Sequence, residues 1–197
     1  MGWAWGASRI VDYLETDSSI DHTKLVMTGV SRAGKSALFA AAFDERITLA
    51  APVASSGGGT PAYRFSGAGR GGHEGLDEEV LKYPNWFSPH LHQFIGHQDQ
   101  LPFDNSWLLA LCAPRPLIAL EGEHDQNVSH NGVRQSMISA RPVYAVFNVT
   151  NKMGVNWAVR PHGEVQDDWD AMFAFADKWL FDKPVTRAFD LYPVEAD

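Results

Sequence analysis

The chain has 197 residues, of which 45% are hydrophobic and 20% charged, and its formal net charge is −8 at pH 7. This length and composition are typical of one globular domain with a substantial core. The acidic balance argues against a nucleic-acid partner, which would need a basic face. No stretch approaches the roughly 18 consecutive apolar residues of a membrane span, so we expect no membrane partner.

The first part of the chain alternates predicted helices and strands. Apolar residues at helical spacing predict an amphipathic helix over 4–15, and a polar turn over 16–23 follows it. Short apolar runs predict buried parallel strands at 24–28 and 47–53, with an alanine-rich helix at 35–43 between them.

The middle of the chain, residues 57–105, is rich in Gly, Pro, His and aromatic residues and has few periodic stretches. We expect an ordered excursion over one face of the sheet, with short helices near 76–82 and 88–95.

The last part returns to the alternating pattern. It predicts helices at 107–112, 134–144 and 167–180 and strands at 116–121 and 145–149. Strands that alternate with helices predict an α/β fold with a parallel sheet and right-handed crossovers. We therefore expect a single domain over residues 1–197.

One octapeptide, Gly-Val-Ser-Arg-Ala-Gly-Lys-Ser at residues 29–36, fits two chemistries. As a phosphate-binding loop, it would use Lys35 on phosphates and Ser36 on Mg²⁺. As a nucleophile elbow between a strand and a helix, it would present Ser31 as the attacking oxygen of an ester hydrolase. The same flanking strand and helix serve both interpretations.

The downstream sequence favours the esterase. A phosphate loop needs a carboxylate at the end of a neighbouring strand, but the strand at 47–53 leads into Ala and Ser. An α/β hydrolase needs an acid and then a histidine in later loops. Asp125 follows the predicted strand at 116–121, and His162 precedes the last predicted helix. A serine becomes a good nucleophile when an imidazole accepts its proton and a carboxylate orients that imidazole.

The segment Gly29-Val-Ser-Arg-Ala-Gly-Lys35 resembles the elbow of the glucuronoyl esterases, carbohydrate esterase family 15. Further similarities run in order from about residue 3 to 182: the stretch 52–59, Trp86-Phe-Ser88, Ala113-Pro-Arg-Pro-Leu117 and His162-Gly163. The resemblance implies an α/β-hydrolase fold and cleavage of esters between 4-O-methyl-glucuronic acid on xylan and lignin alcohols. It also implies no metal or other cofactor, and a secreted or periplasmic location.

The resemblance also implies roles for individual residues. Ser31 is the expected nucleophile and His162 the expected base. Arg32 would stabilise the oxyanion through its backbone N–H and its guanidinium, and Lys35 would bind sugar hydroxyls. Glu79 is the expected sugar-binding carboxylate within the acidic segment 74–79.

Two features depart from the family pattern. Many members carry the triad acid just after the second strand, where this chain reads Ala54-Ser55-Ser56-Gly57. The acid is therefore expected to be Asp125, with Glu123 as the alternative. Only one predicted helix precedes the strand at 24–28, which leaves an unpaired apolar edge. We expect either the C-terminal portion of a longer domain or a second chain that covers this edge.

Plainer interpretations stay open for several residues. Ser31 could be a helix N-cap and Asp125 an Asx-turn residue. Trp86, assigned to the substrate side of the cleft, could instead pack in the core. The histidines at 90, 92 and 97 lack a carboxylate pattern that would favour a metal site.

Alternative functions also stay open. An acetyl-xylan-type deacetylase would use the same triad on a different ester. A phosphate-loop NTP-binding protein and a non-catalytic module that binds a carbohydrate or a partner chain are the lesser alternatives.

Overall fold

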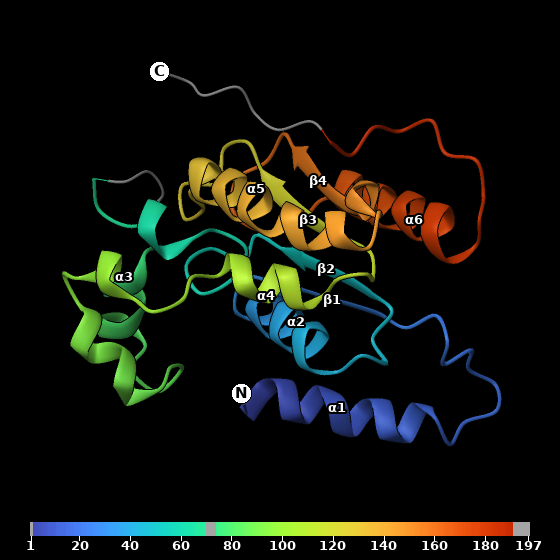
Figure 1. Ribbon diagram of the computed structural model, residues 1–197, viewed down its shortest axis with the longest axis horizontal. Helices are drawn as coiled ribbons and strands as arrows, with labels where there is room; N and C mark the ends of the chain where they lie inside the picture. Colours follow the sequence, from blue (N-terminus) through green and yellow to red (C-terminus); the bar gives the residue numbers. More distant parts are fainter. Residues whose placement is uncertain (1, 70–73, 191–197) are drawn as a thin grey trace.

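A computed structural model describes residues 2–69 and 74–190, so residues 70–73 of the predicted excursion lie outside the described part (Figure 1). Its centre is a sheet of four strands in the order β1-β2-β3-β4: β1 Val26–Val30, β2 Leu49–Val53, β3 Leu117–Gly122 and β4 Met153–Ala158. All neighbouring strands are parallel. Parallel strands all end at the same edge of a sheet, so the loops after them meet there.

The described residues form six α-helices: α1 Gly2–Leu14, α2 Arg32–Phe43, α3 Leu76–Lys82, α4 Ser106–Leu111, α5 His130–Val146 and α6 Gln166–Leu180. One core cluster joins α1, α2, α4 and α5 to one face of the sheet, and a second joins α6 to the other face. Successive side chains of a strand point to opposite faces. Leu117 and Ala119 of β3 accordingly belong to the first cluster, and Ile118 and Leu120 to the second.

The predicted strand at 145–149 is wrong. Helix α5 continues to Val146, because its residue Tyr144 is fully buried in the core and the Tyr144 hydroxyl donates a hydrogen bond to Arg115 O at 3.1 Å. The fourth strand is instead Met153–Ala158, whose apolar pattern is interrupted by Gly154 and Asn156. Gly154 leaves room for the Phe175 ring of α6, and the Asn156 amide donates to Asp167 at 3.0 Å. Packing and polar partners therefore explain a strand that the sequence pattern does not reveal.

The predicted excursion packs around its own small cluster of buried Tyr63, Leu76, Val80 and Leu101. The predicted helix at 76–82 is confirmed as α3, and the one near 88–95 is a 3₁₀ helix over Pro89–Phe94. Figure 1 shows this segment beside the end of the sheet where β1 leads into α2, so it lies next to the loops that follow the strands.

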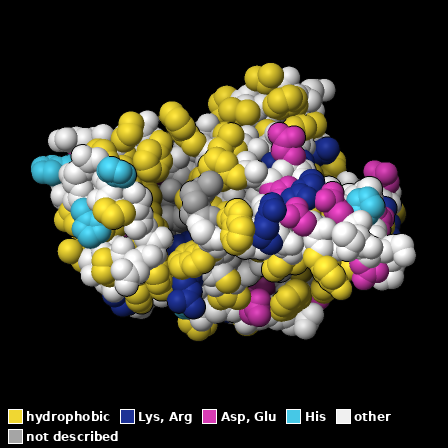
Figure 2. All heavy atoms as spheres, turned by 90° about the horizontal axis from the view of Figure 1, so that it is seen from below, with side chains coloured by type: hydrophobic (Ala, Val, Ile, Leu, Met, Phe, Trp, Pro, Cys, Tyr) yellow, Lys and Arg dark blue, Asp and Glu magenta, His cyan; other side chains and the backbone are white. Residues whose placement is uncertain are grey.

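The α1 side of the molecule is shown in Figure 2, where acidic and basic side chains lie close together. Ion pairs from Arg46 to Asp12 and Glu15, at 2.8 and 2.7 Å, connect the segment before β2 to α1 and to the residue that follows it. Histidines are spread over the surface of the excursion in the same view. Among the described residues, no helix is long and apolar enough to cross a membrane, and no group of three or more His, Cys, Asp or Glu side chains could hold a metal ion.

Strand β1 forms one edge of the sheet. Within the described ranges it pairs only with β2, and its first residue, Val26, is exposed. The covering of this edge by a second chain stays a prediction.

Candidate active site

Ser31 is the single residue between β1 and α2, and its backbone is in an unusual conformation with φ 57° and ψ −118°. A positive φ is uncommon for a residue other than glycine and is found at strained functional turns. The turn is tight enough to require glycine at its base. A Cβ at Gly34 would lie 2.6 Å from Val53 O, and one at Gly29 would lie 2.7 Å from Ala33 O.

Backbone hydrogen bonds hold Ser31 in this turn. Its N–H donates to Val53 O at 2.9 Å, and its carbonyl accepts from Lys35 N at 3.0 Å. Its side chain makes no capping hydrogen bond to α2, although the residue stands at the N-cap position. Arg32 is the first residue of α2, so its N–H has no acceptor within the helix. The turn therefore presents a hydroxyl and an N–H donor at the positive end of a helix dipole.

Asp125 and His162 lie in the loops that follow β3 and β4. His162 Nδ1 lies 2.8 Å from Asp125 Oδ2. The Asp125 side chain is fully buried, while 32% of the His162 side chain is exposed. A buried carboxylate that accepts from Nδ1–H fixes the tautomer in which Nε2 can accept a proton. This hydrogen bond also raises the pKa of His162 above its ordinary value, against the opposing effect of burial.

Asp125 also accepts a hydrogen bond from Asn127 N at 3.0 Å, so the predicted Asx turn is present as well. The two interpretations of Asp125 are compatible, because Oδ1 serves the turn and Oδ2 the histidine. The alternative acid, Glu123, is exposed on the same loop. The structure therefore brings Asp125 to His162.

Lys35 forms a buried polar cluster with residues from β2's following loop and from the excursion. Only 2% of the residue is exposed, and its Nζ lies 2.9 Å from Glu79 Oε1 and donates to Ser56 Oγ at 2.8 Å. The Ser56 hydroxyl in turn donates to Glu74 Oε2 at 2.6 Å. The Lys35 ammonium thus contacts a carboxylate and a hydroxyl of the protein. Because a phosphate-loop lysine must instead reach phosphates, this arrangement disfavours the phosphate-loop interpretation.

The two carboxyl groups of this cluster differ in their protonation behaviour. Burial raises the pKa of Glu79 to about 7, although the Lys35 ammonium opposes this shift. Burial acts to raise the pKa of Glu74 too, but hydrogen bonds from Ser56 and Glu79, together with the positive charges of Lys35 and Lys82, outweigh it and lower this pKa. Near neutral pH the cluster can therefore hold one carboxylate and one carboxyl that titrates.

Arg32 and Trp86 lie against each other at the edge of the site. The Arg32 guanidinium carbon is 5.1 Å from the centre of the Trp86 ring and 5.9 Å from that of Trp3. Tyr83 stacks on Trp86 with ring centres 3.8 Å apart. Trp86 is therefore packed against protein side chains in this structure, and its predicted role in binding substrate stays a prediction.

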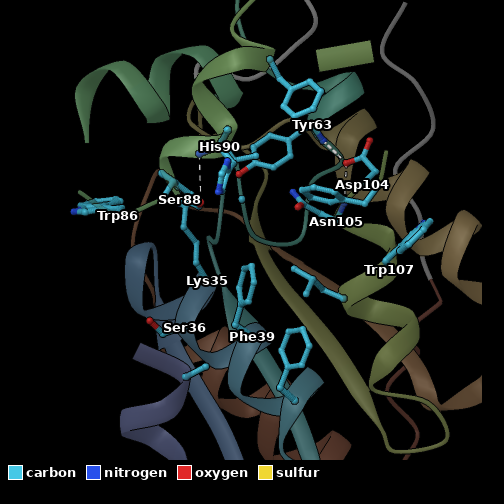
Figure 3. A pocket seen from close by; sticks show the side chains of 18 of the residues that line it. Lys35, Ser36, Phe39, Tyr63, Trp86, Ser88, His90, Asp104, Asn105 and Trp107 are labelled. Atoms are coloured by element: carbon cyan, nitrogen blue, oxygen red, sulfur yellow. Dashed lines mark hydrogen bonds between the residues drawn. The ribbon is translucent and has the colours of Figure 1, made fainter. Parts of the chain in front are cut away.

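A cavity of about 570 Å³ lies beside Lys35 (Figure 3). Figure 3 shows Lys35 and Phe39 of α2 on one side of it, Tyr63 and Asn105 on another, and Trp107 of α4 beyond them. Ser31, Asp125 and His162 are not among its lining residues. The cavity therefore lies next to the buried polar cluster of Lys35, and the Asp125–His162 pair does not line it.

Sequence reasoning does not reveal the roles of two residues at the site, Ser56 and Arg160. Ser56 lies in the stretch that lacks the family acid, and in the structure it bridges Lys35 and Glu74. Arg160 stands in the Arg-Pro-His-Gly stretch that contains His162, but its buried ion pair with Asp168 is a tertiary contact. The sequence feature that points to Arg160 is its position two residues before His162.

A strained serine turn after one parallel strand, with an Asp–His pair after two later strands, is the layout of the α/β hydrolases. The family model "Glucuronyl esterase, fungi" matches residues 1–148. The chain belongs to the glucuronoyl esterase family, also called carbohydrate esterase family 15.

Similar curated proteins include a 4-O-methyl-glucuronoyl methylesterase of Phanerochaete carnosa, 34% identical over 92% of this chain and 46% of the relative. Another, from Hypocrea jecorina, is 35% identical over 94% of this chain and 42% of the relative. This chain thus spans about half the length of the curated relatives it matches.

Solved structures agree with this assignment. The glucuronoyl esterase of Caldicellulosiruptor kristjansonii matches with a TM-score of 0.91 and 35% identity, over 99% of this chain and 54% of that one. A Sporotrichum thermophile glucuronoyl esterase variant was solved with methyl 4-O-methyl-β-D-glucopyranuronate. It matches with a TM-score of 0.81 and 25% identity, over 98% of this chain and 55% of that one.

Proposed function

We propose that Ser31, His162 and Asp125 act as the triad of a serine esterase that hydrolyses 4-O-methyl-glucuronoyl esters linking xylan to lignin alcohols. The observation that carries the proposal is the 2.8 Å contact of His162 Nδ1 with Asp125, at the sheet edge where Ser31 occupies its strained turn. The relatives that are named as methylesterases, and the glucuronate ester bound to the Sporotrichum thermophile glucuronoyl esterase variant, support the substrate class.

The first chemical step is attack by Ser31 Oγ on the ester carbonyl carbon. His162 Nε2 accepts the hydroxyl proton, and Asp125 stabilises the imidazolium that forms. The carbonyl oxygen becomes an oxyanion. The N–H of Arg32, at the start of α2, is oriented for such a charge, and the nearby guanidinium adds positive potential.

The tetrahedral intermediate then expels the alcohol. His162 returns its proton to the leaving oxygen, and the glucuronoyl group stays as an ester on Ser31. A water molecule repeats the sequence: it loses a proton to His162, attacks the acyl carbon, and releases glucuronic acid as Ser31 regains its proton. No metal or cofactor is required at any step.

Lys35 and Glu79 are proposed to bind the sugar. An ammonium group has three N–H donors: one of those of Lys35 donates to Ser56, and a second can serve Glu79 Oε1, which lies 2.9 Å from Nζ in an ion pair. The third would remain for a sugar hydroxyl, and Glu79 would accept from a second hydroxyl.

The test compares Ser31→Ala with Ser36→Ala on benzyl D-glucuronate. We expect Ser31→Ala to lower kcat/KM on the order of 10⁴-fold or more, because the nucleophile is lost. Ser36→Ala removes a neighbouring hydroxyl that has no part in the triad, and it should retain activity. Full activity of Ser31→Ala would disprove the mechanism.

Two further measurements separate the alternatives. Acetyl-xylan and glucuronoyl esters compared at matched concentration distinguish a deacetylase from a glucuronoyl esterase. Calorimetry with Mg-ATP addresses the phosphate-loop alternative, which requires binding that Lys35→Ala abolishes.

A further inference from the structure

Arg160 is the largest of the fully buried side chains, with 2% of the residue exposed, and it stands two positions before His162. A buried guanidinium must be paired to be tolerated. Arg160 Nε donates to Asp168 Oδ2 at 2.6 Å, and Nη2 donates to Asp168 Oδ1 at 3.1 Å. This bidentate contact fixes the plane of the guanidinium and compensates its charge.

The remaining donors of Arg160 reach two backbone carbonyls. Nη2 donates to Leu120 O near the end of β3 at 3.2 Å, and Nη1 donates to Pro161 O at 3.1 Å. The Pro161 carbonyl belongs to the peptide group that joins Pro161 to His162. The guanidinium therefore restrains the plane of the peptide from which the His162 side chain projects.

The main chain of Arg160 restrains the loop that carries Asp125. Its carbonyl accepts a hydrogen bond from His124 N at 3.1 Å, one residue before Asp125. At the start of the same loop, a Cβ on Gly122 would lie 2.6 Å from Arg160 O and 2.8 Å from Arg160 Nη1. Glycine is needed there because the two loops approach so closely. Arg160 thus contacts both loops of the Asp125–His162 pair.

Asp168 anchors this arrangement to α6. Its Oδ2 also accepts from Val165 N at 2.9 Å, which caps the first turn of the helix. The other arginine at this end of α6, Arg187, donates to Asn156 and to Asp167, both at 2.7 Å. Arg187 contacts neither the Asp125 loop nor the His162 loop through these bonds, so it provides a matched control.

We propose that Arg160 is a positioning residue that sets the geometry of the Asp125–His162 hydrogen bond. The proposal rests on the proposed function for its catalytic consequence, but the positioning itself can be measured without turnover. Arg160→Lys keeps the positive charge and loses the planar fork, so it cannot hold Asp168, Leu120 O and Pro161 O together.

The experiment compares Arg160→Lys, Asp168→Asn and Arg187→Lys by proton NMR and by kinetics. The Nδ1 proton of His162 should give a resolved downfield resonance in the unmodified protein. Arg160→Lys and Asp168→Asn should shift or abolish it and lower kcat about 10- to 100-fold with KM little changed, because the base is displaced. Arg187→Lys should leave the resonance and kcat in place.

Asp168→Asn keeps an oxygen for Val165 N–H, so it serves if Arg160→Lys does not fold. A folded Arg160→Lys or Asp168→Asn variant with an unchanged resonance and unchanged kcat would overturn the proposal. Loss of the resonance in these variants, together with full activity of Ser31→Ala, would support the positioning role and reject the esterase mechanism. Failure of the positioning proposal and failure of the proposed esterase mechanism therefore give different results.

Discussion

Ser31, Asp125 and His162 lie in the turn and the loops that follow strands of the sheet, whereas Lys35 reaches Glu79 through a buried ion pair between α2 and the excursion. The backbone of the first group is held by main-chain hydrogen bonds, such as those from Ser31 N to Val53 O and from His124 N to Arg160 O, and the buried Arg160 side chain adds a restraint on the His162 loop. The Lys35–Glu79 pair is held by the attraction between two charged side chains that are buried away from solvent.

The residues after the strands and the buried Lys35–Glu79 pair should therefore respond differently to mutation. Replacement of a side chain at a strand end removes chemistry and leaves the backbone scaffold in place. Replacement of one partner of a buried ion pair leaves an uncompensated charge and destabilises the fold. Activity and stability measurements should therefore separate the two groups.

The largest expected effect is that of His162→Ala. His162 is the proposed general base, so its loss should lower kcat/KM by about 10⁴-fold or more, because triad members act as a unit. The melting temperature should change little, since the side chain is partly exposed. Steady-state kinetics and calorimetry on the same preparation test both statements. A large fall in melting temperature would break the contrast between the two groups.

Asp125→Asn is expected to lower kcat/KM by about 10²- to 10⁴-fold, because the imidazole loses the partner that fixes its tautomer. The Asp125 hydrogen bond raises the pKa of His162. The base works in its neutral form, so activity falls as pH drops through this raised pKa. Removing Asp125 should therefore move the acidic limb of the kcat/KM profile to lower pH. A limb that moves to higher pH would contradict the assignment.

Lys35→Met should lower the free energy of unfolding by about 3–5 kcal/mol, because it leaves Glu79 buried without its cation. Burial already raises the pKa of Glu79 to about 7, so its charged form opposes folding as pH rises through that value. The loss in Lys35→Met should thus be smaller at pH 5 than at pH 8. Denaturant unfolding measures it. The double variant Lys35→Met/Glu79→Leu should recover much of the stability.

Gly34→Ala should lower the free energy of unfolding by about 1–3 kcal/mol, since the added methyl meets backbone atoms of β1 and β2 that cannot move aside. Gly6→Ala in α1 is the matched control: nothing lies within 4 Å of its added Cβ. Alanine is the better helix former, so this control should stabilise by about 0.5–1 kcal/mol. Equal effects of the two variants would refute the close approach at the elbow.

The smallest expected effect is that of Glu123→Gln. This side chain is exposed and the neighbouring Asp125 holds His162, so stability should change by less than about 0.5 kcal/mol. The kcat/KM should stay within about twofold of the original. A loss of kcat/KM comparable to that of Asp125→Asn would identify Glu123 as the triad acid and contradict the present assignment.

Local sequence signals predicted most of the fold. The apolar run at 116–121 and the helical spacing at 167–180 agree with β3 and α6 to within a residue or so. The wrong strand at 145–149 shows the limit, because an apolar run of five residues does not distinguish a strand from the last turn of a helix. Only the buried Tyr144 and its bond to Arg115 O decided that case.

By itself, the sequence determined the alternation of strands and helices, the serine turn and the chain order of serine, acid and histidine. These features are local, since they depend on hydrophobic periodicity and on glycines that a tight turn requires. The tertiary structure decided that Asp125 rather than Glu123 faces His162, that Lys35 pairs with Glu79 and Ser56, and that Arg160 lies between two loops. Such contacts join residues far apart in the chain, and their geometry exists only once the sheet has brought its strand ends together.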